Sequence, residues 1–136
     1  MLVVEDHADT RFMLRTMLEI RGFSVVEVED GEQAIVAAER TRPDLVLMDG
    51  SLPLLDGLSA VRRMRELATL SDVPIVFLSG HADHDFQKLA FDAGCDHYLV
   101  KPLVIDQLDR ILGQHLFPIK TGNPLEATSL SGNVNR

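Results

Sequence analysis

The chain has 136 residues, which is the length of one ordinary domain that can bury a core without disulfides or a structural metal. Its net charge of −8 makes nucleic acid and anionic lipid poor direct partners, and favours a divalent cation or a basic protein surface. A single cysteine, no signal-peptide pattern and no apolar run near the ~20 residues of a membrane span together predict a cytoplasmic protein.

The first half of the chain alternates short apolar runs with segments of helical spacing. The run at 2–4 precedes a helix marked by apolar residues at 13, 14, 17 and 18, and Gly22 is placed to end that helix. The run at 24–28 alternates in polarity, which suits a strand at a sheet edge. A helix of small residues over 34–38 must stop before Pro43.

The second half repeats this alternation. Apolar runs at 45–48, 75–78 and 98–100 are rich in Val, Leu and Ile, as buried parallel strands are. Apolar residues at helical spacing follow each run, and they predict helices around 58–65, 86–93 and 105–112.

Five strands alternating with five helices predict an α/β fold, in which a parallel sheet has helices on both faces. Right-handed connections favour the doubly wound, flavodoxin-like strand order 2-1-3-4-5. We expect this domain to span residues 1–116. Residues 117–136 are rich in Gly, Asn, Ser and Thr and predict a flexible C-terminal tail or linker. Because Met1 begins almost inside the first strand, the N-terminus could be truncated.

Chemically useful side chains follow four of the predicted strands. Glu5 and Asp6 follow the first, Asp49 the third, Ser79 the fourth and Lys101 the fifth. In an open parallel sheet, ligands bind outside the carboxyl ends of the strands where the strand order reverses. We therefore expect three carboxylates in one cleft, with a hydroxyl and an ammonium beside them.

Three neighbouring carboxylates need a counter-charge, and a hard divalent cation supplies it. We expect Mg²⁺, with Mn²⁺ as the alternative. One carboxylate can then act as a nucleophile toward a phosphoryl group, with Lys101 and Ser79 contacting its oxygens. Taken singly, these residues have structural readings. Asp6 or Asp9 could cap a helix, Ser79 could belong to a plain turn, and Lys101 could be a solvated charge.

Four sequence blocks, in order and at matching spacing, resemble the receiver domains of two-component response regulators, which have a CheY-like fold. The blocks are LVVEDH, VLMDGSLPLLDG, PIVFLSGHA and AGCDHYLVKP, and the resemblance covers nearly all of residues 1–116. It implies that Asp49 is the phosphoacceptor and that Glu5 and Asp6 serve Mg²⁺ together with the Ser51 backbone carbonyl. The remaining implied residues are the switch pair Ser79 and Tyr98, the lysine Lys101, the loop-shaping Pro53 and Gly57, and Pro102, whose preceding bond is usually cis.

The resemblance also implies a function: a phosphoacceptor in a two-component or phosphorelay system. Its phosphoryl donor would be a phosphohistidine on a histidine kinase or a histidine phosphotransfer protein. Phosphorylation would bury Tyr98 and change the face formed by the fourth helix, fifth strand and fifth helix, which a downstream protein reads. Phosphorylation could also produce a dimer. The domain would be no enzyme beyond catalysing its own phosphorylation and dephosphorylation, and Ser51 and His81 are candidates for setting the phosphoryl lifetime. It could stand alone or come from a hybrid kinase or longer regulator.

Competing interpretations are weaker. A flavodoxin needs a phosphate-cradling loop after the first strand, where this chain is acidic. A haloacid dehalogenase-type hydrolase has Asp-x-Asp at the end of the first strand. A degenerate receiver, which binds partners without phosphorylation, would lack an acceptor or a lysine. We do not expect a histidine-based metal site, because the spacing of the five histidines fits no zinc pattern.

Overall fold

The structure is a computed structural model that describes residues 1–52 and 56–116. Pro53, expected to shape the loop after Asp49, and the expected tail at 117–136 lie outside the described residues. The strands and helices alternate as predicted. In chain order they are β1 (Leu2–Val4), α1 (Ala8–Ile20), β2 (Val26–Val28), α2 (Gly31–Thr41), β3 (Val46–Asp49), α3 (Gly57–Arg65), the 3₁₀ turn η1 (Ala68–Leu70), β4 (Ile75–Ser79), α4 (His84–Ala93), β5 (His97–Val100) and α5 (Ile105–Leu116).

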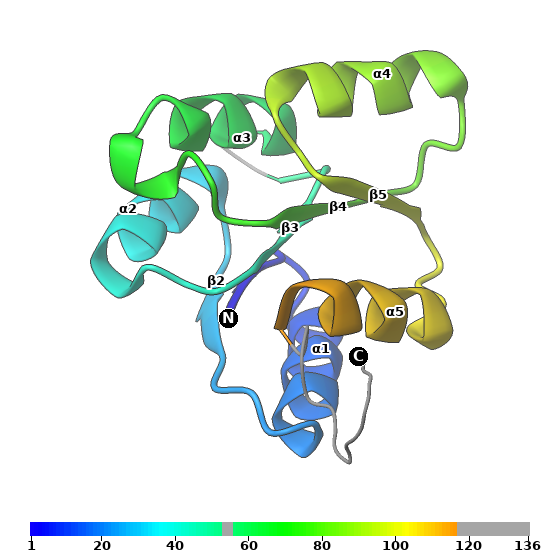
Figure 1. The fold of residues 1–136 in the computed structure, drawn as a ribbon. Helices are drawn as coiled ribbons and strands as arrows, with labels where there is room; N and C mark the ends of the chain where they lie inside the picture. The colour runs from blue at the N-terminus through cyan, green and yellow to red at the C-terminus, as the bar shows by residue number, and fades with distance from the viewer. Residues whose placement is uncertain (53–55, 117–136) are drawn as a thin grey trace, which may run out of the picture. The chain divides into compact units, whose positions relative to one another are not determined.

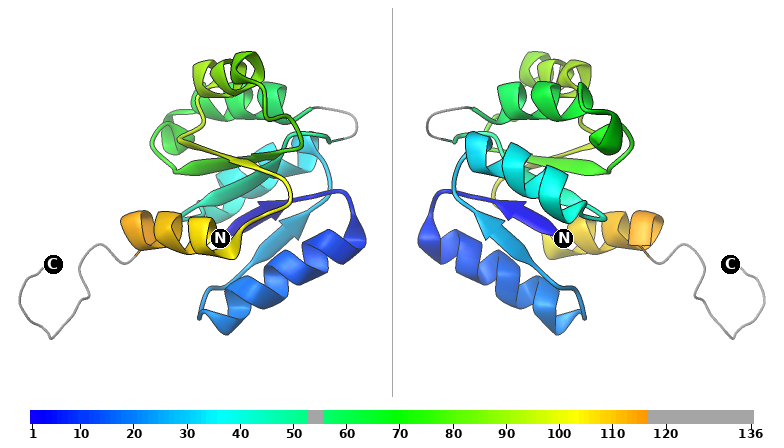
Figure 2. Two further views of the ribbon diagram at one scale, coloured as in Figure 1. Left: turned by 90° about the vertical axis from the view of Figure 1, so that its right-hand side faces the viewer. Right: turned by 90° about the vertical axis from the view of Figure 1, so that its left-hand side faces the viewer.

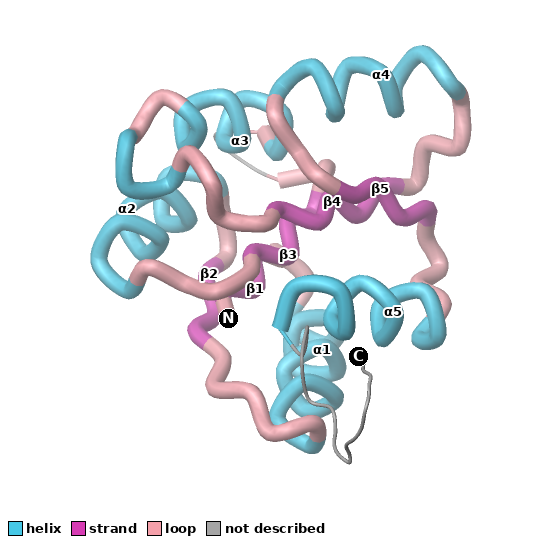
Figure 3. The backbone as a smooth tube through the Cα atoms, viewed as in Figure 1, coloured by secondary structure: helices cyan, strands magenta, loops and turns pink. Residues whose placement is uncertain are grey.

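All five strands form one parallel sheet in the order β2-β1-β3-β4-β5, which confirms the predicted topology. Figures 1 and 3 show this sheet crossing the middle of the first unit, and Figure 2 shows its layers. Helix α1 covers one face, whereas α2, α3 and α4 cover the other. The order reverses between β1 and β3, so this is where a ligand site is expected.

The chain divides into two compact units, Met1–Leu103 and Val104–Arg136. In the second unit the structure describes α5, whose Leu108, Ile111 and Leu112 are buried on one side. Ile105, which the periodicity assigned to the same apolar stripe, is 43% exposed. The expected receiver domain boundary at residue 116 stays a prediction.

The core of the first unit is built from strand residues and one stripe of each covering helix. Every residue of β1, β3 and β4 is buried, as expected for strands covered on both faces. In α1, Leu14, Met17 and Leu18 are buried, but Met13 is half exposed, because it lies one position away from the buried stripe. None of the helices in residues 1–52 and 56–116 combines the length and apolar character that a membrane span requires.

The helix N-termini are capped by aspartates other than those expected at the functional site. Asp30, Asp56 and Asp83 each accept a backbone N–H at the start of α2, α3 and α4, which stabilises those helix starts. Helix α1 instead begins after His7, whose side chain makes no capping hydrogen bond. The structure therefore does not support a capping role for Asp6, which the sequence left open. At the other end of α1, Gly22 has a φ of +92° and its N–H donates to the Glu19 carbonyl, as a glycine C-terminal cap does.

Candidate functional site

The register of the sheet brings the predicted side chains to one edge. Asp49 ends β3, beside Leu78 of β4, and Ser79 ends β4, beside Val100 of β5. Glu5 and Asp6 follow β1, which neighbours β3. One ligand atom from each of Glu5, Asp6, His7 and Asp49 lies within 4.8 Å of the others. The structure therefore gathers the three expected carboxylates and adds His7, which the spacing of the histidines had not predicted.

Asp49 has one engaged oxygen and one free oxygen. Its Oδ1 accepts hydrogen bonds from Lys101 Nζ at 2.9 Å and from the Ser51 backbone N–H at 3.1 Å. Its Oδ2 is buried and has no hydrogen-bond partner, although the side chain is only 1% exposed. Lys101 is thus not a solvated charge: it and the Ser51 amide fix the orientation of the carboxylate, and Oδ2 faces the remaining acidic groups.

Glu5 is the second deeply buried carboxylate. Its Oε2 accepts from the His7 backbone N–H at 3.2 Å and lies 3.3 Å from His7 Nδ1. Its Oε1 is 3.8 Å from Lys101 Nζ, which is too far for a hydrogen bond, so this oxygen is unsatisfied. Asp6 Oδ1 is also buried and lacks a hydrogen bond, although His7 Nδ1 lies 3.2 Å away.

The electrostatics of the site reflect this crowding. Burial raises the pKa of Glu5, and the neighbouring Asp49 raises it further, against the opposing effects of the His7 N–H and Lys101. Partial burial alone would lower the pKa of Lys101, but its hydrogen bond to Asp49 and the surrounding carboxylates outweigh burial and raise it. Three carboxylates and one ammonium, if all are ionised, leave a local charge of −2.

These donors fit a hard divalent cation. Glu5 Oε1, Asp6 Oδ1 and Asp49 Oδ2 are buried oxygens that each lack a protein hydrogen bond. Leaving such groups unsatisfied costs about 1–3 kcal/mol each, and more when they are charged, so a ligand that engages all three together gains that free energy. An ion of charge +2 would also balance the local charge. Oxygen donors and room for further ligands are what Mg²⁺ prefers.

Ser79 and Tyr98 are joined through the backbone of His81. The Ser79 Oγ accepts from the His81 N–H at 3.0 Å, and the Tyr98 hydroxyl donates to the His81 carbonyl oxygen at 2.6 Å. The Tyr98 ring stacks on Phe77 with a centroid separation of 5.8 Å. Ser79 therefore does form the local turn that its sequence context allowed. Tyr98 is half-buried here, and the expected burial of its ring on phosphorylation stays a prediction.

The structure also describes the other residues that the sequence singled out. The Lys101-Pro102 bond is cis, as the resemblance implied. Ser51 is exposed beside Asp49, and His81 is exposed on the loop after β4. Cys95 is a buried free thiol, and burial raises its pKa to about 12. It is therefore a packing residue, as predicted, and not a nucleophile.

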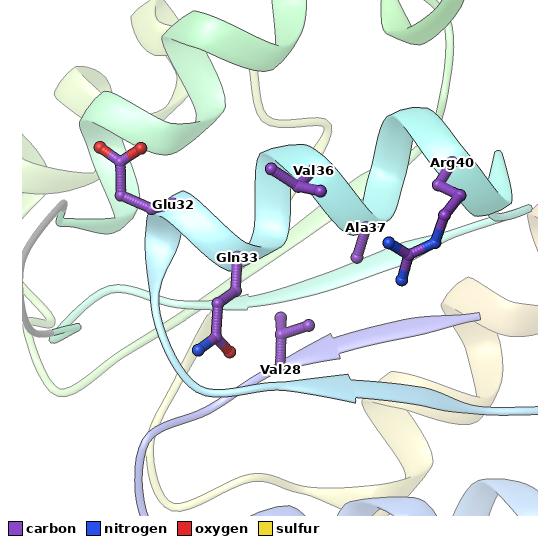
Figure 4. A pocket seen from close by; sticks show the side chains of 6 residues that line it. All are labelled: Val28, Glu32, Gln33, Val36, Ala37 and Arg40. Carbon is purple, nitrogen blue, oxygen red and sulfur yellow. The ribbon is translucent and has the colours of Figure 1, made fainter.

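Of two pockets on the described surface, only the smaller is lined by a residue of the Glu5, Asp6 and Asp49 cluster. The larger, about 440 Å³, lies between α2 and β2 and is lined by Val28, Gln33 and Arg40 among others (Figure 4). It gathers no cluster of carboxylates and no free nucleophile. The smaller, about 220 Å³, includes Glu5 and Lys101 in its lining. We therefore place the functional site by its chemistry, at the carboxylates, and not by pocket volume.

Comparison with known proteins gives a consistent result. Residues 1–112 match the family described as the response regulator receiver domain. The chain is similar to the transcriptional regulatory proteins PrrA and PdtaR of Mycobacterium tuberculosis. The identities are 38% over 107 residues and 41% over 108 residues, and each match covers 79% of this chain. It covers 45% of PrrA and 51% of PdtaR, so the chain spans about half the length of these curated relatives.

Solved structures agree in fold. The receiver domain of the sensor histidine kinase PA1611 from Pseudomonas aeruginosa, solved with a magnesium ion coordinated in its active site cleft, is 39% identical with a TM-score of 0.78. That match covers 84% of this chain and 93% of the PA1611 chain. The chemotaxis protein CheY4 of Vibrio cholerae is 26% identical with a TM-score of 0.79, over 85% of this chain and 96% of CheY4.

Proposed function

This chain belongs to the response regulator receiver domain family, and from that premise we propose that it accepts a phosphoryl group on Asp49 with Mg²⁺ as its cofactor. The donor is a phosphohistidine of a histidine kinase or a histidine phosphotransfer protein. The output is a change of surface that a partner protein reads. The domain is a signalling phosphoacceptor, and the only reactions it catalyses are its own phosphorylation and dephosphorylation.

The observation that carries this proposal is the asymmetry of the Asp49 carboxylate. Lys101 and the Ser51 amide hold Oδ1, which leaves Oδ2 as a buried oxygen with a free lone pair and a fixed direction. A positioned, partly desolvated carboxylate beside a cation is suited to attack phosphorus. Glu5 and Asp6 would hold the dication, with Asp6 the more direct ligand and the Ser51 carbonyl as a further one; the clustering of their oxygens with Asp49 supports this assignment.

The transfer needs few groups from the protein. Asp49 Oδ2 forms a bond to phosphorus as the phosphorus–nitrogen bond of the phosphohistidine breaks, and the leaving imidazole keeps the electron pair. The Mg²⁺ that Glu5, Asp6 and Asp49 would hold would supply positive charge for the phosphoryl oxygens. Lys101, which contacts Asp49 Oδ1 at 2.9 Å, would donate instead to a phosphoryl oxygen once Asp49 is phosphorylated.

The switch residues respond to the new phosphoryl oxygens. The Ser79 hydroxyl leaves the His81 N–H to donate to a phosphoryl oxygen, and Tyr98 packs deeper. Phosphorylation biases this equilibrium only through contacts that differ between the two states. In the first unit, the expected output face includes α4 and β5, and Leu89 and Phe91 of α4 are each nearly half exposed. These two side chains are candidate contacts for the downstream partner.

Ser51 and His81 set the phosphoryl lifetime in this proposal, because both are exposed beside the acceptor or the switch serine. Their side chains would govern the access of water to the acyl phosphate. Substituting both with alanine should change the decay rate of the phosphorylated protein, measured by loss of the phosphorylated mass. An unchanged decay would remove this role from both residues.

The setting of the domain is also a proposal. We infer a cytoplasmic receiver spanning residues 1–116, either on its own or as part of a hybrid kinase or longer regulator, since the relatives are about twice its length. A net charge of −8 argues against direct binding to nucleic acid or membrane. A dimer formed on phosphorylation is tested by size-exclusion chromatography before and after treatment with a phosphodonor.

Acetyl phosphate with Mg²⁺, followed by intact mass measurement, tests the central claim. The parent protein should gain one phosphoryl group, whereas Asp49→Asn should gain none. Omitting Mg²⁺ should suppress the gain. Phosphorylation of Asp49→Asn to the same extent as the parent would show that another residue is the acceptor, and the proposal would fail.

A further inference from the structure

We propose that His7 is a nitrogen ligand of the metal site. Divalent ions that bind imidazole well, such as Co²⁺ and Zn²⁺, are then held by His7 as well as by the carboxylates, whereas Mg²⁺ is held by the carboxylates alone. This inference rests on the proposed function insofar as Glu5, Asp6 and Asp49 form the metal centre. It goes further, because it assigns a role to a side chain outside the carboxylate set.

The position of the His7 ring carries the inference. Its Nδ1 lies 3.3 Å from Glu5 Oε2 and 3.2 Å from Asp6 Oδ1. Two ligands at right angles on an ion with bonds of about 2.1 Å are about 3.0 Å apart, and opposite ligands are about 4.2 Å apart. One atom from each of the four residues lies within 4.8 Å of the others, so a small contraction brings all four onto one ion.

The His7 ring is positioned by its contacts with the two carboxylates and not by a helix cap. The residue begins α1 from an extended backbone (φ −82°, ψ 118°) and its side chain makes no capping hydrogen bond. The side chain is 74% exposed, and its polar neighbours are the carboxylates of Glu5 and Asp6. The imidazole therefore lies at the acidic cluster through contacts with the same groups that would hold the ion.

The buried oxygens give a second, independent reason to expect an ion at this position. Glu5 and Asp49 are each 1% exposed, and each has one oxygen without a hydrogen bond. Together with Asp6 Oδ1 they supply three oxygen donors, and His7 Nδ1 makes the set mixed. The other positions of the coordination sphere stay open for water and phosphoryl oxygens.

This donor set has a consequence for metal preference. Mg²⁺ prefers oxygen and gains little from imidazole, whereas Co²⁺, Ni²⁺, Cu²⁺ and Zn²⁺ bind imidazole well. Removing the ring should therefore weaken binding of the second group of ions and leave Mg²⁺ almost unaffected. The selectivity between Co²⁺ and Mg²⁺ becomes the diagnostic quantity.

Titration calorimetry of Mg²⁺ and Co²⁺ on the parent and on His7→Ala tests the prediction. The variant should bind Co²⁺ about 10–100-fold more weakly, the range known for loss of a partner that supports a metal ligand. Its Mg²⁺ affinity should change by no more than about 2–3-fold, because oxygen ligands dominate that ion. The matched control is His84→Ala, which removes another exposed histidine at the start of a helix, α4, and should alter neither affinity.

A spectroscopic readout separates direct ligation from a general effect. Pulsed electron paramagnetic resonance of the Mn²⁺-loaded parent should show coupling to an imidazole nitrogen, and His7→Ala should lose it. His7→Ser serves as a second variant, because serine is a favourable helix N-cap and keeps the start of α1 stable. Circular dichroism checks that both variants are folded.

The outcomes distinguish this inference from the proposed function. If His7→Ala binds Co²⁺ as tightly as the parent, or the nitrogen coupling persists without His7, the ligand role is overturned while Mg²⁺ binding and phosphorylation of Asp49 stand. If the parent binds neither ion, the metal centre itself is refuted, and the inference with it.

Discussion

Gly57, the first residue of α3, lies against the main chain that carries Asp49. A Cβ at this position would be 2.6 Å from the Asp49 carbonyl oxygen, 2.9 Å from Gly50 Cα and 3.0 Å from a Phe77 ring carbon. Real Cβ contacts stay at 3.0 Å or more, so Gly57→Ala forces a displacement of at least about 0.4 Å, the difference between 3.0 and 2.6 Å. The atom in the way is backbone, which cannot rotate aside.

Gly57→Ala should lower both the stability of the protein and the rate at which Asp49 is phosphorylated. Overpacking of this kind costs about 1–3 kcal/mol in the free energy of unfolding, and each kcal/mol lowers the melting temperature of a domain of this size by roughly 3–5 °C. The displaced Asp49 also loses its alignment with Lys101. Since a misplacement of ~1 Å at a reacting group costs about 100-fold, we expect a phosphorylation rate on the order of 10-fold lower.

Thermal unfolding followed by circular dichroism and the rate of phosphorylation by acetyl phosphate measure both effects. Gly113→Ala is the matched control, because a Cβ on Gly113 of α5 meets no atom within 4 Å. It should raise stability by up to about 1 kcal/mol through helix propensity and leave the rate unchanged. If Gly57→Ala keeps its stability within about 0.5 kcal/mol and keeps the full rate, the steric argument is wrong.

Three further substitutions or changes of condition test the structure. Arg65 donates hydrogen bonds to the carbonyl oxygens of Gly94, Leu70 and Val73 and to the Asp96 carboxylate. Arg65→Met should therefore lower the free energy of unfolding, measured in urea, by about 3 kcal/mol, and a loss below about 1 kcal/mol would contradict a structural role. Burial raises the pKa of Cys95 from 9.0 to about 12, so the thiol of the unfolded chain ionises first. The free energy of unfolding should therefore fall above pH 9, by at most about 1.4 kcal/mol per pH unit. Cys95→Ala should show a shallower decline between pH 8.5 and 10, and parallel declines of the two proteins would refute the assignment. Burial and Asp49 raise the pKa of Glu5 in the folded protein. In metal-free protein, the contribution of neutral Glu5 to the free energy of unfolding is therefore fully present below the ordinary glutamate range and is lost as the pH rises through the raised pKa. Mg²⁺ should increase the melting temperature more at pH 7.5 than at pH 5, and Glu5→Gln should reduce that difference.

The sequence predicted the strand order and the gathering of carboxylates because both follow from the alternation of elements. A parallel sheet places strand ends at one edge, so Glu5, Asp6 and Asp49 could be brought together without knowledge of side-chain contacts. Element ends were less predictable. The strand expected from residue 24 begins at Val26, although the Met1 amine donates to the Ser24 carbonyl and the Val26 N–H donates to the Met1 carbonyl, which extends the parallel pairing with β1 beyond the assigned strand.

Side-chain partners within the site could not be read from the sequence. His7 was missed because zinc patterns rely on local spacing of histidine and cysteine, whereas Asp49 reaches His7 from a distant strand. The free rotation of a hydroxyl also hid the partner of Ser79, which is the His81 N–H. A usable signal for His7 did exist, since the residue directly follows two strand-end acids.

The two hydrogen bonds of the His81 main chain connect one loop residue to two side chains of the site, Ser79 and Tyr98. Ser79 is tied to its nitrogen and Tyr98 to its oxygen. Release of the serine frees the backbone that anchors the tyrosine, so the two side chains should respond as a unit. Because this connection consists of main-chain atoms, changing the imidazole alone leaves it intact, and the chemistry exposed at position 81 can vary while the transmission of the signal is preserved.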